Sequence, residues 1–206
     1  MVKQRLKKVD VAADGQCLFN SVAYLILYHK NKKTTNYKKL ATKLRNAVCD
    51  MLEVEVDSEK KKKYINRNLI HQLSAELESI SNAKMNATNE NSMTKRAEKY
   101  IEVMRKKKTW GGIIELNFLF KIVSEVLGFK GIKVYHLKRD KLKKNKVSGL
   151  THVGKLYQIK GGMDTLINNK KIEPHLDIIL HDYEIGGRHY DPLIPVPKIT
   201  TRKVGK

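Results

Sequence analysis

The feature that most constrains the fold is a nearly unbroken apolar run that extends from Leu18 to Tyr28. A helix with apolar side chains on almost every face must be enclosed by the rest of the protein. The run is too short to cross a bilayer, which takes about 20 apolar residues, and Asp14 is placed to cap it. We therefore expect a central, buried helix whose first residue is Cys17.

Downstream of this run, the apolar residues first recur at helical spacing and then gather in short β-prone segments. The helical pattern covers residues 37–52, 59–80 and 113–127 and a helix capped by Thr94, with a polar loop at 82–92. The β-prone segments are residues 132–137, 155–159, 176–181 and 188–193, and residues 182–187 suit a hairpin between the last two. Helices followed by strands predict an α+β chain, in the form of an α/β/α sandwich with a small mixed sheet.

Size and composition predict one domain. A chain of 206 residues, 41% of them hydrophobic, can enclose one sizeable core. The sequence has no internal repeat and no proline- or serine-rich linker. We expect a single domain over residues 1–206, with its core at residues 10–195 and a basic tail at residues 196–206.

The cysteine content limits the classes of site. Two cysteines, Cys17 and Cys49, are too few for a disulfide scaffold or a four-ligand structural zinc site. The first ten residues are basic and polar and do not resemble a secretory signal. We expect an intracellular reducing compartment, either the cytoplasm or a host cytosol if the protein is a delivered effector, with a thiol left free for chemistry.

A net charge of +21 makes binding to nucleic acid or to an anionic membrane surface an alternative to consider. Only eight of the 42 basic residues are arginine, the side chain that best suits bidentate contacts with phosphates and bases. The lysines are scattered, and no aromatic residues alternate with them as a platform for single strands would require. The composition therefore favours a lysine-solvated surface and no specific nucleic-acid site.

Cys17 lies where a nucleophile would be activated. The unpaired N–H groups and the dipole at a helix N-terminus stabilise a thiolate. The backbone N–H groups of Gly15, Gln16 and Cys17 could also point at the oxygen of a tetrahedral intermediate and form an oxyanion hole. Asp14 would keep this loop in shape. Cys49, inside an amphipathic helix, is expected to be an inert thiol.

His189 is the best candidate for the base among seven histidines. It follows a glycine pair, begins a short strand and precedes Asp191 by two residues. Residues two apart in a strand project to the same side, so the Asp191 carboxylate could fix the tautomer of the imidazole. The other six histidines have no recognisable catalytic context; they are His29, His71, His136, His152, His175 and His181.

Three sequence blocks together resemble the ovarian tumour (OTU) family of cysteine proteases. Residues 14–19, Asp-Gly-Gln-Cys-Leu-Phe, are similar to the family signature around its nucleophile. Residues 109–112, Thr-Trp-Gly-Gly, and residues 189–191, His-Tyr-Asp, are similar to its central and C-terminal blocks. Because the blocks occur in the family's order and span most of the chain, a chance match is hard to sustain.

The resemblance implies a papain-like OTU fold with Cys17, His189 and Asp191 as a catalytic triad, and no cofactor or metal. It implies cleavage of isopeptide or peptide bonds after the C-terminal Gly-Gly of ubiquitin, with ubiquitin or polyubiquitin chains as partners. Asn20 departs from the family, many members of which carry arginine there. Two alternatives stay open: an inactive OTU-like module that binds ubiquitin, and a basic nucleic-acid-binding protein in which the triad is incidental.

The Trp110-Gly111-Gly112 block has two interpretations. The glycines could line a narrow channel for the substrate's diglycine, because backbone without side chains tolerates close approach. Alternatively, Trp110 fills the core and the glycines only turn the chain. The sequence leaves both open.

An acidic segment at residues 50–59 is the candidate contact for ubiquitin, much of whose recognition face is basic. Its members include Glu53, Glu55 and Asp57. The resemblance places this region in the helical lobe that holds the distal ubiquitin. The alternative is an ordinary solvated loop that balances the lysines at residues 60–63.

Overall fold

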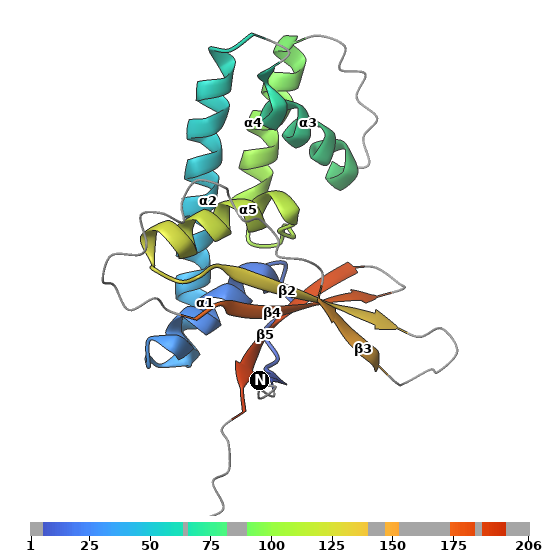
Figure 1. Cartoon of the computed structure of the whole chain (residues 1–206). Coiled ribbons are helices and arrows are strands. Elements are labelled where there is room, and N and C mark those ends of the chain that lie inside the picture. Colours follow the sequence, from blue (N-terminus) through green and yellow to red (C-terminus); the bar gives the residue numbers. More distant parts are fainter. Residues whose placement is uncertain are drawn as a thin grey trace, which may run out of the picture.

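The computed structural model describes residues 6–63, 66–81, 90–139, 147–152, 174–183 and 187–196. Helices flank a small mixed sheet, and a lobe of three helices extends away from it (Figure 1). The fold class is therefore α+β, as the sequence predicts. No helix among the described residues has the length and apolar character needed to span a bilayer.

The helix α1 (Cys17–His29) is the buried centre predicted from the apolar run. Its side chains at Phe19, Val22 and Leu25 are fully enclosed, because the helix packs against both α2 and the strand β5. The prediction that Asp14 caps this helix is wrong. Gln16 occupies the N-cap position, without a side-chain hydrogen bond to the helix.

Five strands form the sheet in the order β1-β5-β4-β2-β3. They are β1 (Leu6–Lys8), β2 (Ile132–Arg139), β3 (Val147–His152), β4 (Leu176–Tyr183) and β5 (Gly187–Pro195). β2 and β4 are parallel, and the other neighbours are antiparallel. The sheet is thus mixed, as predicted.

Three of the predicted strands and the hairpin between β4 and β5 are confirmed, although the turn at residues 184–186 lies outside the described part of the chain. The strand predicted at residues 155–159 also lies outside it. β1 and β3 were not predicted. β1 has only three residues, and β3 contains a glycine, so neither shows a clear β pattern.

The helical boundaries differ from the prediction in three places. The helix predicted at residues 59–80 begins only at Asn68. α2 (Tyr37–Lys60) continues through the acidic segment instead of ending near residue 52, because Leu52 and Val56 extend its buried face. α4 (Glu90–Met104) begins before Thr94, which therefore does not cap it, and residues 82–89 of the predicted loop lie outside the described residues. The remaining helices are the short η1 (Thr34–Asn36), α3 (Asn68–Ser81), α5 (Ile113–Lys121) and the π-helical turn η3 (Ile122–Val126).

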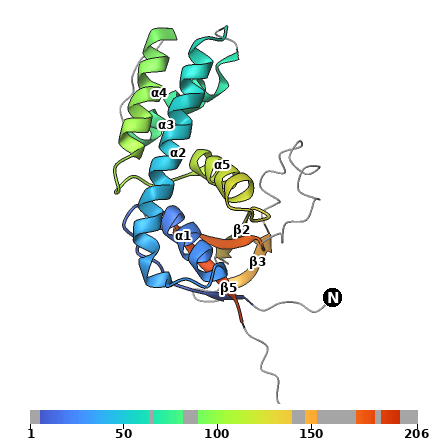
Figure 2. The same cartoon turned by 90° about the vertical axis from the view of Figure 1, so that its left-hand side faces the viewer.

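A buried carboxylate joins α2 to α3 at the end of the lobe. Glu59 is 5% exposed and accepts hydrogen bonds from the backbone N–H groups of Leu69 and Ile70, at 3.2 and 2.9 Å. These N–H groups belong to the first turn of α3, where they have no helical partner. Glu59 therefore caps α3 from the neighbouring helix. Figure 2 shows the lobe standing clear of the sheet, with α2 as its link to α1.

Candidate active site

Cys17 is the first residue of α1, and only 2% of its surface is exposed. The loop that delivers it depends on Gly15, which has a φ of +80°. A Cβ at Gly15 would also lie 2.5 Å from backbone atoms of Lys108. Only glycine satisfies both demands, so the loop can press against the chain that precedes Trp110.

Asp14 shapes this loop through the N-cap residue. Its Oδ1 accepts hydrogen bonds from the backbone N–H of Gln16 at 3.1 Å and from the Asn20 side chain at 3.0 Å. Asn20, the departure from the family pattern, is fully buried and is thus part of the loop's support. Of the three N–H groups predicted to form an oxyanion hole, that of Gln16 is engaged by Asp14, whereas the role of the Gly15 and Cys17 groups stays a prediction.

Arg45 on α2 ties the loop to a second segment, and the sequence analysis missed it. Its fully buried guanidinium donates hydrogen bonds to the carbonyls of Gly15 and Thr109, both at 2.8 Å, and of Met104 at 2.6 Å. It also lies over the Phe19 ring, 4.5 Å from the ring centroid. Arg45 therefore fixes the Cys17 loop relative to the chain that leads into Trp110. An arginine among apolar positions of α2 was the available signal.

His189 and Asp191 lie on β5 as the two-residue spacing predicts. Nε2 of His189 is 3.0 Å from Oδ1 of Asp191, and both side chains are buried. Among the described residues, Nδ1 of His189 has no hydrogen-bond partner although it is enclosed. With Nε2–H donating to the carboxylate, Nδ1 is left as a free acceptor.

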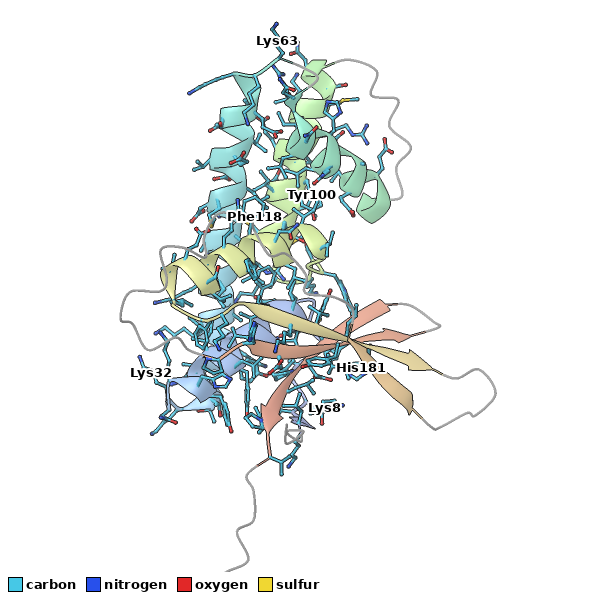
Figure 3. All side chains as sticks on the ribbon, in the orientation of Figure 1. Lys8, Lys32, Lys63, Tyr100, Phe118 and His181 are labelled. Atoms are coloured by element: carbon cyan, nitrogen blue, oxygen red, sulfur yellow. The ribbon has the colours of Figure 1, made fainter. Side chains whose placement is uncertain are left out.

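Asp191 is held from several sides. Oδ1 also accepts a hydrogen bond from the Val11 N–H at 3.1 Å, while Nε2 of His181 lies 3.2 Å and Nζ of Lys8 lies 3.5 Å from Oδ2. Figure 3 labels Lys8 and His181 beside the sheet. Burial by itself would raise the pKa of Asp191, but the contacts with His181, Val11 and His189 outweigh it and lower the pKa to about 2. Asp191 is therefore a carboxylate across the physiological range.

The packing of α1 against β5 brings Cys17 to the strand that carries His189. Ser21, one turn after Cys17 in α1, donates a hydrogen bond from Oγ to the Tyr190 carbonyl at 2.8 Å. The Cys17 thiol faces the backbone N–H of Tyr190, the residue between His189 and Asp191. Burial raises the pKa of Cys17, and the N–H groups of Tyr190 and Leu18 oppose this rise. A raised pKa favours the protonated thiol of Cys17 at neutral pH.

The Trp110-Gly111-Gly112 block lies against the beginning of α1. Trp110 is 43% exposed, so the interpretation in which it fills the core is wrong. A Cβ at Gly111 would lie 3.0 Å from the Leu18 side chain, so the backbone here approaches the residue that follows Cys17. Gly112 donates its N–H to the buried carboxylate of Glu115 at 2.7 Å.

The acidic segment is helical and not the loop of the alternative interpretation, but two of its carboxylates do pair with lysines at residues 60–63, as that alternative expected. Arg105 lies 2.8 Å from Glu53, Lys62 lies 3.8 Å from Glu55, and Lys60 lies 2.8 Å from Asp57. The three acidic residues lie in the second half of α2, which extends into the lobe (Figure 1).

The surface next to the Cys17 loop is basic. A hollow of about 500 Å³ adjoins the loop residues, and its lining consists of Asp14, Gln16, Lys38, Lys39, Thr42, Lys43 and Lys107. The basic recognition face of ubiquitin would favour an acidic surface near the site. The acidic segment at residues 50–59, which is the candidate contact for ubiquitin, belongs to the lobe instead.

The sequence analysis also missed His181, which it had grouped with histidines of no catalytic context. The predicted hairpin contained the signal. In the antiparallel register of β4 and β5, His181 pairs directly with His189. A histidine at that distance before the turn could therefore have been placed next to His189 and Asp191.

Comparison with known proteins identifies the family to which the sequence is similar. The sequence matches the family described as OTU-like cysteine protease over residues 12–158, a range that includes Cys17 and Trp110 but ends before His189. None of the curated proteins matches. Similar solved structures include an OTU deubiquitinase from Wolbachia pipientis wMel, 14% identical with a TM-score of 0.46, over 94% of this chain and 91% of that one. Another is the viral OTU domain protease from Farallon virus, 14% identical with a TM-score of 0.45, over 93% and 85% of the two chains.

Proposed function

Because the chain belongs to the OTU-like cysteine protease family, we propose that it is a thiol-dependent deubiquitinase that hydrolyses bonds after the C-terminal Gly-Gly of ubiquitin. The observation that carries this proposal is the state of His189. Its Nε2 faces the Asp191 carboxylate at 3.0 Å, and its enclosed Nδ1 has no partner within the described residues. A general base needs this arrangement, in which one ring nitrogen is oriented and the other is free to take a proton.

In the proposed reaction, Nδ1 of His189 takes the proton from Sγ of Cys17 as the thiolate attacks the carbonyl carbon of the terminal glycine. The backbone N–H of Cys17, with that of Gly15, stabilises the oxyanion. His189 then protonates the leaving amine, which departs as the C–N bond breaks. His189 next removes a proton from water, which attacks the thioester and releases the ubiquitin carboxylate and the Cys17 thiol.

The raised pKa of Cys17 bears on the timing of the first step. Burial favours the neutral thiol before substrate binds. Proton transfer to His189 would therefore accompany substrate binding, and little thiolate would precede it. An enclosed thiol is also protected from adventitious oxidation, since reactivity follows thiolate content and access. We propose a reducing compartment for this free thiol.

We further propose that Trp110, Gly111 and Gly112 line the channel for the substrate's diglycine. The support is their place beside α1: Gly111 approaches Leu18 closely, and Trp110 is exposed next to it. An exposed aromatic ring offers a surface over an extended chain, while adjacent glycines let backbone approach backbone.

A ubiquitin whose C-terminus carries an electrophile tests the proposal. It should label the wild-type protein and the Cys49→Ala variant equally, and it should leave Cys17→Ala unlabelled. Cys49 is the matched control because it is also a buried free thiol. Failure to label the folded wild type would overturn the proposed activity, and noncovalent binding of ubiquitin in that case would support the inactive module. The same warhead on other ubiquitin-like modifiers would define the range of partners.

A further inference from the structure

Each oxygen of the Asp191 carboxylate lies close to a different histidine. Oδ1 faces Nε2 of His189 at 3.0 Å and also receives the Val11 N–H, whereas Oδ2 lies 3.2 Å from Nε2 of His181. His181 comes from β4, where it pairs with His189 across the hairpin. We propose that His181 is a positioning residue that holds Oδ2 of Asp191 and so keeps Oδ1 directed at His189.

The need for a second contact follows from the freedom of a carboxylate. The torsion that orients the carboxylate of an aspartate is broad, so a single contact does not determine the plane of the group. Two contacts on Oδ1 still allow the group to tilt about that oxygen. A partner on Oδ2 removes this freedom, in the way that outer partners fix the ligands of a metal site.

His181 is better suited to this role than Lys8, whose ammonium group also lies near Oδ2. Nζ of Lys8 is farther from Oδ2, at 3.5 Å, and lies 2.5 Å from Asp10. The Lys8 side chain is also 44% exposed, whereas that of His181 is 12% exposed. Water screens the lysine, and its long side chain has more rotamers to lose. The contact from the enclosed imidazole is therefore the more constraining one.

The influence of His181 on His189 should run through Asp191. The two imidazole rings are 6.2 Å apart between centroids and tilted by 37°, too distant for a hydrogen bond between them. They nevertheless share one carboxylate. This arrangement predicts that the catalytic effect of His181 disappears when Asp191 is absent, which a merely structural residue would not show.

The test is a double-mutant cycle, and it rests on the proposed function for its activity readout. The variants are His181→Leu, Asp191→Ala and the two combined, with His181→Gln as the conservative variant and Lys8→Met as the matched control. We expect His181→Leu to lower kcat about tenfold on a fluorogenic ubiquitin amide, with KM almost unchanged, by analogy with other outer partners. His181→Gln should restore most of kcat because its amide can still donate, and Lys8→Met should lower kcat less than His181→Leu does because the lysine contact is longer and more exposed.

Within the Asp191→Ala background, His181→Leu should lower kcat by less than about twofold. A full additional loss there, or an undiminished kcat in the single variant, would overturn the proposal. If His181→Leu does not fold, as judged by its thermal melt, His181→Gln and His181→Asn replace it, and a large loss with the glutamine donor in place would count against the role.

A second readout separates this inference from the proposed function. In the Cys49→Ala background, the rate at which iodoacetamide alkylates Cys17 depends on its partnership with His189 and needs no ubiquitin. We expect His181→Leu to lower this rate by no more than Asp191→Ala does, and the combined variant to match Asp191→Ala. An inactive wild-type protein would refute the proposed deubiquitinase activity. An alkylation rate that is the same with and without His181 would refute the positioning role.

Discussion

The candidate catalytic centre and the exposed surface of the helical lobe hold their charged groups in opposite ways. Around Cys17, Asp191 and Arg45 are buried, and each makes several contacts from different elements. In the lobe, pairs such as Asp57 with Lys60 and Lys99 with Glu102 join exposed side chains on one helix. Exposed pairs contribute about 0–1 kcal/mol, while removing one member of a buried set costs several times more.

This difference shows what buried charges and exposed charge pairs each contribute to the protein. A buried charge with several partners fixes the relative position of loops, so its loss affects geometry and catalysis together. An exposed pair sets only the local electrostatic field, and salt screens it. The centre should therefore be sensitive to conservative changes, and the exposed surface of the lobe should tolerate even charge reversal.

The largest expected effect is that of His189→Ala, which removes the group with the free Nδ1. We expect hydrolysis of a fluorogenic ubiquitin amide to fall to background, because the variant lacks the group that is proposed to move the proton. Single-turnover kinetics with folded protein would measure this. Activity within tenfold of wild type would show that another residue is the base.

Asp191→Ala is the graded comparison within the same site. Asp191 orients the imidazole and moves no proton itself, so we expect a loss in kcat of about ten- to a thousandfold. If this variant matched wild type while Asp14→Ala was inactive, Asp14 would be the third member of the triad.

Arg45→Met compares the centre with the lobe directly. It leaves the carbonyls of Gly15 and Thr109 without their charged donor, so we expect about 2–4 kcal/mol less stability and a lower kcat. The matched change is Arg105→Met, since Arg105 pairs with Asp50 and Glu53 and its side chain is 34% exposed. That change should cost less than about 1 kcal/mol in urea unfolding. Equal losses would end the distinction between the two regions.

The same distinction explains how far the sequence could be read. The buried helix, the hairpin and the pairing of His189 with Asp191 depend on local spacing, and the structure has all three. Arg45 could not be assigned its partners, because its contact with Thr109 joins residues 64 positions apart and depends on how α2 packs.

The predicted helix boundaries were wrong where the local sequence pattern and the tertiary packing favour different structures. The acidic segment looks like a loop by composition, yet α2 passes through it because Val56 and Glu59 complete a buried face. The capping role expected of Asp14 failed for a related reason. Its carboxylate is short enough to bond the Gln16 N–H two residues ahead, which forms the loop one residue before the helix.

Acid should weaken the contribution of Asp191 in a defined range. Its pKa is lowered to about 2 in the folded protein, against about 3.9 in an unfolded chain. The carboxylate therefore stabilises the fold fully above about pH 4, and this contribution is lost as the pH falls toward 2. We expect urea unfolding of wild type and Asp191→Asn to differ by about 2 kcal/mol at pH 5 and to converge near pH 2. A gap that does not change with pH would contradict this.

The smallest expected effect is that of reversing the acidic segment, with Glu53, Glu55 and Asp57 all changed to lysine. Because each carboxylate already has a basic partner, its attraction for a basic ubiquitin face is partly cancelled. If the segment binds ubiquitin as proposed, KM should rise about two- to fivefold at low salt with kcat unchanged, and the difference should vanish at high salt. Stability should change by less than about 1 kcal/mol.

The control variant changes Glu76, Glu98 and Glu102 to lysine. It has the same net charge as the test variant, but its substitutions lie on α3 and α4. An equal rise in KM for the control would mean that only total charge matters, and an unchanged KM in both would leave the segment as surface ion pairs with no part in binding.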